Sequence, residues 1–241
     1  MRCSRTVDPA AVKQHLCRRS DAWDDDAAGI AEISHFDWPD PRGPENGPQG
    51  VHRPRVVART KYDETYLSVR FEVEEDSFVR CARTQWCEQV CEDSCCEFFV
   101  APAAESDART SYINFEVNAA GTMLAYHCVP GSETQALSMT DAASILVSSS
   151  LDPKRTTAAD AGRAIDPEIT ATYGVEIRVP WHIFRTYFGV EAPPPSGSRW
   201  RCNFYKCGDK TSHPHWGSWA PVGSERPNFH RPADFQQLAF E

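Results

Sequence analysis

The sequence of 241 residues contains no CxxC pair, although it has ten cysteines. Paired thiols at that spacing are typical of zinc ribbons and thioredoxin-like redox sites, so their lack disfavours both classes. No apolar run approaches the roughly 18–20 residues that a membrane helix needs. The N-terminus also lacks the apolar centre and small-residue cleavage site of a signal peptide. We therefore expect a cytoplasmic protein with reduced thiols and no membrane contact.

Basic charge in excess is missing as well. The formal net charge is −9 and the pI is about 5.4, whereas a nucleic-acid-binding domain needs a basic face. Internal repeats are absent, and the proline-rich stretches are too short to separate domains. The composition of 41% apolar and 24% charged residues is ordinary for a folded protein. We predict an N-terminal arm or short strand over residues 1–20 and one domain over residues 21–241, with no nucleic-acid partner.

Short segments with alternating apolar and polar residues recur along the chain. In Tyr66–Val73, for example, Leu67, Val69 and Phe71 alternate with polar residues, which is typical of a half-buried strand. Comparable strands are expected at 31–36, 55–60, 95–100, 112–117, 122–128, 174–179, 199–206 and 235–240, with a hairpin turn over 118–121.

Few segments favour anything other than strands. Residues 38–54 carry five prolines and three glycines, which predicts a surface loop. Residues 130–167 predict an exposed insertion with one strand inside it, at the apolar run 145–147. One short helix is expected over 181–188, ended by Gly189. The chain therefore predicts an all-β fold, an antiparallel β-sandwich of jelly-roll or immunoglobulin-like architecture with one short helix.

The segment 201–232 (RCNFYKCGDKTSHPHWGSWAPVGSERPNFHRP) concentrates aromatic and hydrogen-bonding side chains between glycines and prolines. It is too polar for a core strand and too aromatic for an ordinary loop. Planar side chains beside hydrogen-bonding groups suit a flat ligand with an apolar face and a polar edge, such as a sugar ring.

A set of motifs in chain order carries a family resemblance. They are YLSVRFEV, VCEDSCCEFFV, YINFEVNAAGTMLAY, VEIRVPWHIF, NFYKCGDKTSHPHWGSWAPVG and NFHRPADFQQLAFE. Together, from about Trp23 to Glu241, they resemble the family 9 carbohydrate-binding modules, and most closely their stand-alone bacterial relatives with a DOMON-like sandwich. The resemblance implies non-catalytic binding of a sugar or glycan, no cofactor, and structural calcium in some members.

The resemblance also implies a site in which two tryptophans hold the sugar. Trp219, with Trp216 beside it, matches the late aromatic segment, and Glu97 matches the carboxylate of the Glu-Phe-Phe strand. The second family tryptophan corresponds to Cys91, so Trp86 is the nearby candidate for that wall. Since Trp216 and Trp219 are three positions apart on an extended chain, one should face the core and the other a cleft.

Further candidates lie on neighbouring strands. Asn203 and Tyr205 should share one strand face while Lys206 takes the other. Asn114 is the candidate on the YINFEV strand. Glu97 could instead be buried in an ion pair with Lys206 or Arg201.

Other interpretations remain open at this stage. Cys207, Asp209, His213 and His215 could form a metal site, since thiolate, imidazole and carboxylate suit zinc. Cys207 with His213 or His215 could also form the nucleophile and base of an enzyme. A structural interaction module is favoured if both tryptophans are buried. The acidic triplet at residues 24–26 could bind calcium or form a solvated turn.

Overall fold

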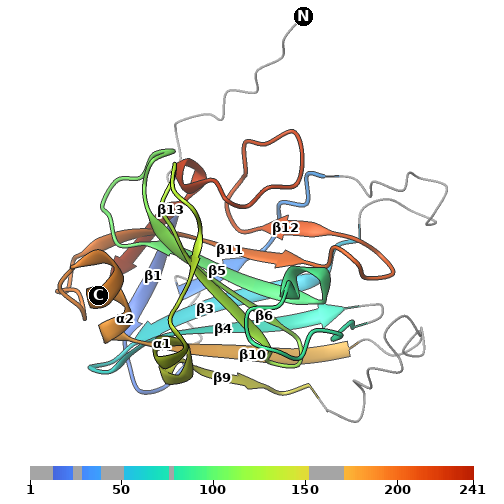
Figure 1. Ribbon diagram of the computed structural model, residues 1–241, viewed down its shortest axis with the longest axis horizontal. Coiled ribbons are helices and arrows are strands. Elements are labelled where there is room, and N and C mark those ends of the chain that lie inside the picture. The colour runs from blue at the N-terminus through green and yellow to red at the C-terminus, as the bar shows by residue number, and fades with distance from the viewer. Residues whose placement is uncertain (1–12, 24–28, 39–51, 76–78, 152–170) are drawn as a thin grey trace, which may run out of the picture.

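The structure is a computed structural model, and it describes residues 13–23, 29–38, 52–75, 79–151 and 171–241. Its strands form two layers that face each other (Figure 1). We call them sheet A and sheet B. Sheet A contains β5 (Cys95–Ala101), β6 (Tyr112–Asn118), β7 (Met123–Cys128), β8 (Gln135–Ala136), β11 (Arg199–Cys207), β12 (Trp216–Ser218) and β13 (Gln236–Phe240). Sheet B contains β2 (Ile30–Glu32), β3 (Arg55–Tyr62), β4 (Tyr66–Glu75), β9 (Leu146–Ser149) and β10 (Ala171–Pro180).

Strand β1 (Gln14–Arg19) joins the two sheets. Its first four residues pair with β13 and its last two with β3, both in parallel orientation. The continuous order is β8-β7-β6-β5-β11-β13-β1-β3-β4-β10-β9, with β12 on β11 and β2 on β3. The predicted all-β sandwich is confirmed, and the parallel β1 makes it a curled mixed sheet. Part of the segment 1–20 is thus a strand at the centre of the fold.

The main core lies between the two sheets. Along β4 the apolar residues Leu67, Val69, Phe71 and Val73 are fully buried, as the alternation predicts. From sheet A, Phe98, Phe115 and Phe204 pack against them, with Phe98 and Phe204 stacked at 5.3 Å between ring centroids. Burial of these side chains on the facing surfaces stabilises the sandwich.

Two α-helices and two short 3-10 helices (η3, Val90–Glu92; η6, Pro232–Asp234) lie among the described loops. The predicted helix is α2 (Trp181–Phe188), and Gly189 ends it in the left-handed conformation with φ 65°. The second helix, α1 (Met139–Ser144), begins at the N-cap Ser138 inside the insertion, where the sequence predicted only the strand that is now β9. Among the described residues, no helix is long and apolar enough to cross a membrane.

Sheet A is covered on both faces. Every residue of β5 and β6 is buried, because loops pack over the face that points away from sheet B. A second apolar cluster fills that face, with Phe99, Tyr112 and Tyr205 from the strands and Phe229 and Phe235 from the C-terminal loops. This outer face of sheet A, with its covering loops, is the setting of the candidate site.

Candidate functional site

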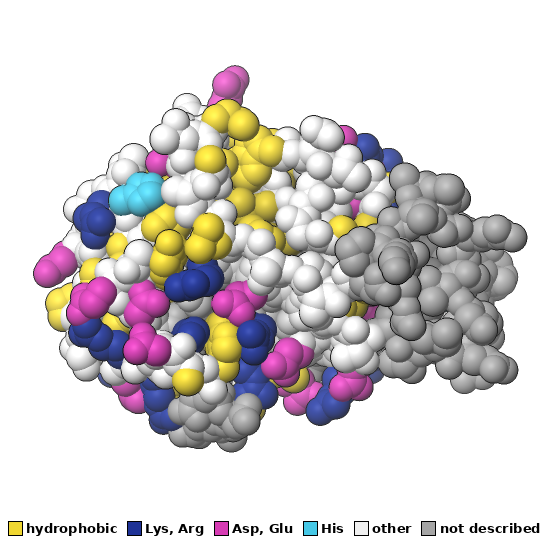
Figure 2. All heavy atoms as spheres, turned by 90° about the horizontal axis from the view of Figure 1, so that it is seen from below, with side chains coloured by type: hydrophobic (Ala, Val, Ile, Leu, Met, Phe, Trp, Pro, Cys, Tyr) yellow, Lys and Arg dark blue, Asp and Glu magenta, His cyan; other side chains and the backbone are white. Residues whose placement is uncertain are grey.

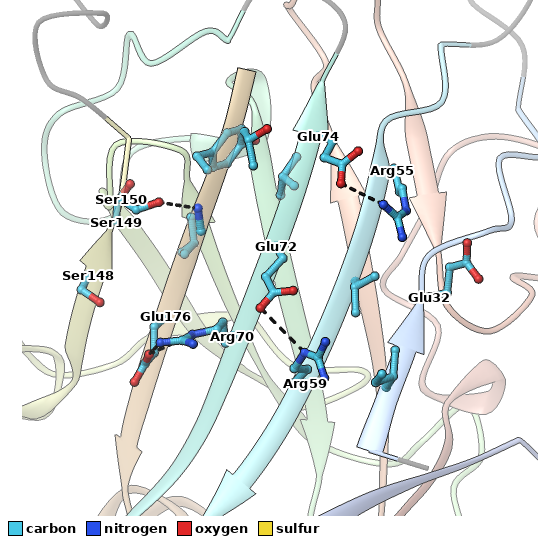
Figure 3. Close-up of a pocket in the computed structure, with 17 residues that line it drawn as sticks. Glu32, Arg55, Arg59, Arg70, Glu72, Glu74, Ser148, Ser149, Ser150 and Glu176 are labelled. Carbon is cyan, nitrogen blue, oxygen red and sulfur yellow. Dashed lines mark hydrogen bonds and ion pairs between the residues drawn. The ribbon is translucent and has the colours of Figure 1, made fainter. Parts of the chain in front are cut away.

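The larger of the two main hollows lies on the outer face of sheet B and measures about 740 Å³. Its charged side chains bond to one another across the strands, as Figure 3 shows. The pairs are Arg55–Glu74 at 2.9 Å, Arg59–Glu72 at 3.7 Å and Arg70–Glu176 at 2.9 Å. Basic and acidic side chains are also mixed on the face seen in Figure 2. Charges that compensate each other in this way are typical of a solvated sheet face, so we do not place the site here.

A second cavity of about 310 Å³ lies on the outer face of sheet A, and we call it the Trp216 cavity. Strands β5, β6, β7, β11 and β12 supply its floor, and the loops at residues 89–91 and 227–230 supply its walls. Its lining residues are Gln89, Cys91, Glu97, Glu116, Leu124, Tyr126, Thr134, Cys207, Asp209, Trp216, Pro227, Asn228, Phe229 and His230. Aromatic rings, carboxylates and thiols therefore converge in one hollow.

The indole ring of Trp216, which lines the cavity, is held in place by a carboxylate. The half-buried Trp216 donates a hydrogen bond from Nε1 to Oδ1 of Asp209 at 2.7 Å. Burial raises the pKa of the Asp209 carboxyl, while the bond from Trp216 lowers it. Asp209 is fixed in turn, because its backbone N–H donates to the Cys91 carbonyl at 3.0 Å. The ring is thus oriented from its edge, which leaves the cavity beside it open.

Two more carboxylates lie on the floor. Glu97 of β5 and Glu116 of β6 are directly opposite each other in the sheet register, and they are 2% and 5% exposed. Burial raises the pKa of Glu97 well above its usual value, and the neighbouring Glu116 raises it further. Burial also raises the pKa of Glu116 to about 7, against a bond from Asn114 that lowers it. Both carboxyls can exchange hydrogen bonds with polar groups of a ligand.

The remaining polar wall comes from β7 and the C-terminal loop. Tyr126 of β7 is half-buried and lines the cavity, and so does His230 of the C-terminal loop. The His230 Nδ1 atom forms a 2.8 Å hydrogen bond with the Tyr112 hydroxyl, so the ring is anchored from below. Burial lowers the pKa of His230. Glu116, Tyr126 and His230 were not among the site candidates from sequence, and Asp209 was a candidate only for a metal.

Of the two candidate tryptophans, the structure brings Trp216 and not Trp219 to the cavity. Trp219 is only 5% exposed and belongs to the main core. Its ring packs edge-on against His15 and Phe204, at 5.9 and 5.6 Å between centroids. The predicted division of the pair between core and cleft is therefore observed.

Three candidates on β11 are completely buried. Asn203 accepts a hydrogen bond from the Ala220 backbone N–H at 3.0 Å and donates one to the Ala220 carbonyl at 3.2 Å. Tyr205 stacks on Phe229 at 4.1 Å. The hydrogen bonds of Asn203 and the stacking of Tyr205 fix the segment after β12. Asn203 and Tyr205 therefore support the cavity without lining it.

Lys206 points to the opposite face of β11, as the alternation predicts. Its Nζ lies 2.7 Å from Oε1 of Glu75 and 3.1 Å from Nε2 of His215. The Tyr173 hydroxyl donates to the other Glu75 oxygen at 3.1 Å. Burial lowers the pKa of Lys206, but the Glu75 carboxylate and neighbouring groups together raise it by more, so the net pKa lies above its usual value. The partner of Lys206 is thus Glu75, and the ion pair suggested for Glu97 with Lys206 or Arg201 is wrong, because Arg201 pairs with Glu105.

Two further candidates also lie outside the cavity surface. Trp86 packs against the main core and does not line the cavity, whereas Cys91 does. Asn114 is fully buried beneath the cavity and donates to Glu116 Oε1 at 2.6 Å. Its role is to orient that carboxyl.

The candidate metal set Cys207, Asp209, His213 and His215 is divided between two faces. Cys207 and Asp209 line the cavity, whereas His215 contacts Lys206 and donates a hydrogen bond from Nδ1 to the His213 carbonyl at 2.8 Å. Cys207 lies 2.9 Å from a Glu97 oxygen, and burial raises the pKa of its thiol well above its usual value. Among the described residues, the Cys207 sulfur bonds to Glu97 and to the Cys91 carbonyl and not to a histidine, so the Cys–His pair of a thiol enzyme is not formed there. The acidic triplet 24–26 lies outside the described residues.

A family model described as carbohydrate-binding family 9 matches residues 27–240. A protein from Bacteroides uniformis, provisionally assigned as carbohydrate-binding, is 27% identical with a TM-score of 0.72, over 95% of this chain and 99% of that one. No curated protein matches.

Two solved structures of family 9 modules from Caldicellulosiruptor kristjanssonii share the fold. One, in complex with glucose, is 12% identical with a TM-score of 0.57, over 95% of this chain and 96% of that chain. The other, in complex with cellotriose, is 11% identical with a TM-score of 0.58, over 95% and 94%. At this identity the likeness concerns the fold alone.

Proposed function

Since the chain belongs to carbohydrate-binding family 9, whose model matches residues 27–240, we propose that it binds a carbohydrate non-covalently in the Trp216 cavity. The family supports a binding module without catalysis. The neighbours of the same fold that were solved with glucose and cellotriose support a sugar as ligand.

The observation that carries the proposal is the Trp216 ring, fixed by Asp209 at the edge of a cavity with a carboxylate floor. A sugar ring has C–H groups on its faces and hydroxyls around its edge. The indole face can pack against the C–H groups, which gains dispersion energy and removes apolar surface from water. A ring already oriented in the free protein loses little entropy on binding.

The floor is suited to hydroxyl groups. Glu97 and Glu116 offer carboxyl oxygens that accept hydrogen bonds from neighbouring sugar hydroxyls, and Asn114 holds Glu116 in position at 2.6 Å. Because burial raises the pKa of both carboxyls, each can also carry a proton and donate a hydrogen bond to a sugar oxygen. Two sugar hydroxyls bound between Glu97 and Glu116 would supply the hydrogen bonds that these carboxyls lose when burial removes their water.

Tyr126 is the aromatic residue that we propose for the second wall. Trp219 packs in the main core and Trp86 packs against it, and Cys91 supplies only a small side chain at the position where the family resemblance implied a tryptophan. Tyr126 lines the same cavity as Trp216. Its phenol combines an apolar face with a hydroxyl that reaches a sugar edge.

The charge and size of the cavity limit the ligand. The described residues that line the cavity include no lysine or arginine, but they include three acidic residues, Glu97, Glu116 and Asp209. A neutral sugar should therefore be preferred over uronic acids or sugar phosphates, whose negative charge would find no cation to pair with in this lining. The volume of about 310 Å³ lies at the low end for small-molecule sites, which favours a short saccharide or a chain end.

Calorimetric titration with glucose, cellotriose, other neutral sugars and glucuronic acid tests the proposal. We expect saturable binding of a neutral sugar, weakened about tenfold by Trp216→Ala and unchanged by Trp86→Phe, a variant of a tryptophan outside the cavity. The recovered sugar should be chemically unchanged. Absence of binding across a broad panel of neutral sugars by folded protein would overturn the proposal, and equal losses in both variants would place the site elsewhere.

A further inference from the structure

Three metal-ligating side chains meet beneath the Trp216 cavity. The Sγ atoms of Cys95 and Cys207 and a carboxylate oxygen of Glu97 all lie within 4.8 Å of one another. The three residues are 0%, 1% and 2% exposed. In the part of the chain that the structure describes, this is the one such group of three found.

The sheet register brings these residues together. Cys207 of β11 pairs directly with Cys95 of β5, and Tyr205 pairs with Glu97. Cys95 and Glu97 are two residues apart, so they share the outer face of sheet A, whereas Cys96 between them points into the main core. The convergence is therefore a property of the backbone pairing and needs no unusual side-chain conformation.

Lys206, which interacts electrostatically with Cys95 and Glu97, is already neutralised by Glu75. The lining residues of the cavity include no lysine or arginine within the described residues, and Lys206 pairs with Glu75 on the opposite face of the strand. The Cys207 thiol donates to Glu97 Oε1 at 2.9 Å, and its sulfur also lies 3.6 Å from the Cys91 carbonyl. Thiols and a carboxyl thus bond among themselves, where a cation would satisfy all of them.

We propose that Cys95, Glu97 and Cys207 bind a thiophilic divalent cation of the Zn²⁺ class, through two sulfurs and one carboxylate oxygen. Zinc takes thiolate and carboxylate ligands in tetrahedral geometry, at about 2.3 Å from sulfur and about 2.0–2.2 Å from oxygen. Ligand atoms around such an ion are roughly 3.5–4 Å apart, so the observed separations require only small side-chain movements.

Binding releases protons. Both thiols lose their proton to solvent as the sulfur–metal bonds form, and the carboxyl binds as the carboxylate. Two thiolates, one carboxylate and one Zn²⁺ give a site with a net charge of −1. The fourth position faces the cavity, where water or the Cys91 thiol, which also lines the cavity, can complete the coordination.

This site differs from the one that the sequence suggested. The histidines of that set, His213 and His215, lie outside the group, because His215 contacts Lys206 on the other face of β11. The proposed ion does not depend on sugar binding, and its test uses no carbohydrate.

The test is titration of the reduced, metal-free full chain with Zn²⁺ alone by calorimetry, and with Co²⁺ alone by absorption spectroscopy. We expect one ion per chain, and for Co²⁺ the near-ultraviolet charge-transfer bands of sulfur ligation. The Cys95→Ala/Cys207→Ala double variant should lose both, and Glu97→Gln should weaken binding. Circular dichroism of each variant establishes that it is folded.

Matched controls separate this site from the other thiols. Cys96→Ala changes the adjacent residue on the opposite strand face, and Cys202→Ala changes another buried thiol of β11; both should retain one ion and the charge-transfer bands. The proposal is overturned if the folded, reduced chain takes up no stoichiometric ion, if Co²⁺ binds without sulfur bands, or if the Cys95→Ala/Cys207→Ala variant binds as well as the unaltered chain.

Discussion

The indole nitrogen of Trp216 and the carboxylate of Asp209 form a 2.7 Å hydrogen bond across the turn that follows β11. Both residues line the same cavity. The turn itself is tied to the opposite loop by backbone hydrogen bonds from Asp209 to Cys91 at 3.0 Å and from Lys210 to Glu92 at 3.1 Å. Two loops distant in sequence therefore fix the orientation of one aromatic ring.

This relationship predicts different effects of two substitutions at one position. Asp209→Ala removes the acceptor and should weaken sugar binding several-fold, because the ring must then be ordered when the ligand binds. Asp209→Asn keeps an oxygen acceptor and should have a smaller effect. Calorimetric titration with the best sugar of the panel measures both, and equal losses would mean that the carboxylate contacts the ligand itself.

Gly217 permits β12 to lie close to the segment before β3. A Cβ atom at this position would lie 2.5 Å from the Phe36 ring and 2.9 Å from Cγ2 of Ile33. Gly217→Ala should therefore lower the free energy of unfolding by about 1–3 kcal/mol, as measured by urea denaturation, and should weaken sugar binding by displacing the adjacent Trp216.

Gly223 offers the control for that substitution. A Cβ atom there would meet its nearest neighbour, Arg231 Nη2, at an ordinary 3.5 Å. Gly223→Ala should leave stability and sugar binding close to those of the unaltered chain. If the two alanine variants were equally stable, the close packing of β12 against Phe36 would be contradicted.

Strand alternation predicted most of the fold because it reports which residues face a core. Leu67, Val69 and Phe71 are buried as expected, and Gly189 ends the helix where its conformational freedom indicated. The parallel position of β1 could not be predicted, since pairing between residues 14–19 and the last strand is set by tertiary packing. Helix α1 is short and polar, so it has no apolar stripe to read.

The candidate site was harder to predict for a related reason. Alternation shows that Trp216 and Trp219 face opposite ways, but both faces of sheet A are covered, so polarity does not reveal which face carries the cavity. Glu116 had a usable signal, because it shares a strand face with Asn114 and is opposite Glu97 once β5 and β6 are paired. Cys95 and Cys207 are far apart in sequence, and only the register makes them neighbours.

The buried ion pair of Lys206 and Glu75 predicts a strongly non-additive pair of variants. Lys206→Met leaves the Glu75 carboxylate, 1% exposed, without its cation and should cost about 3–5 kcal/mol of unfolding free energy. Adding Glu75→Gln removes the uncompensated charge and should restore part of that loss. Urea denaturation of the two single variants and the double variant measures the coupling, and additive losses would contradict a direct interaction.

His15 predicts how stability depends on pH. The side chain is 1% exposed, forms a 2.9 Å bond with Thr60 and packs against Phe204 and Trp219. Burial lowers its pKa from 6.5 to about 3 in the folded chain. The unfolded chain therefore binds the proton at a higher pH than the folded chain does. This contribution to stability is fully present above about pH 6.5 and is lost as the pH falls toward 3, by about 1.4 kcal/mol per pH unit within that window.

His15→Gln isolates this contribution, because glutamine does not titrate. Urea denaturation at several pH values between about 7 and 4 should give a shallower fall in the free energy of unfolding for the variant than for the unaltered chain. The comparison uses the slope with pH, so a constant loss of stability from the substitution does not affect it. His127→Gln is the control, since its imidazole is only partly buried and its pKa is lowered less. Parallel slopes for the unaltered chain and His15→Gln would show that His15 is protonated equally in both states, which its apolar surroundings disfavour.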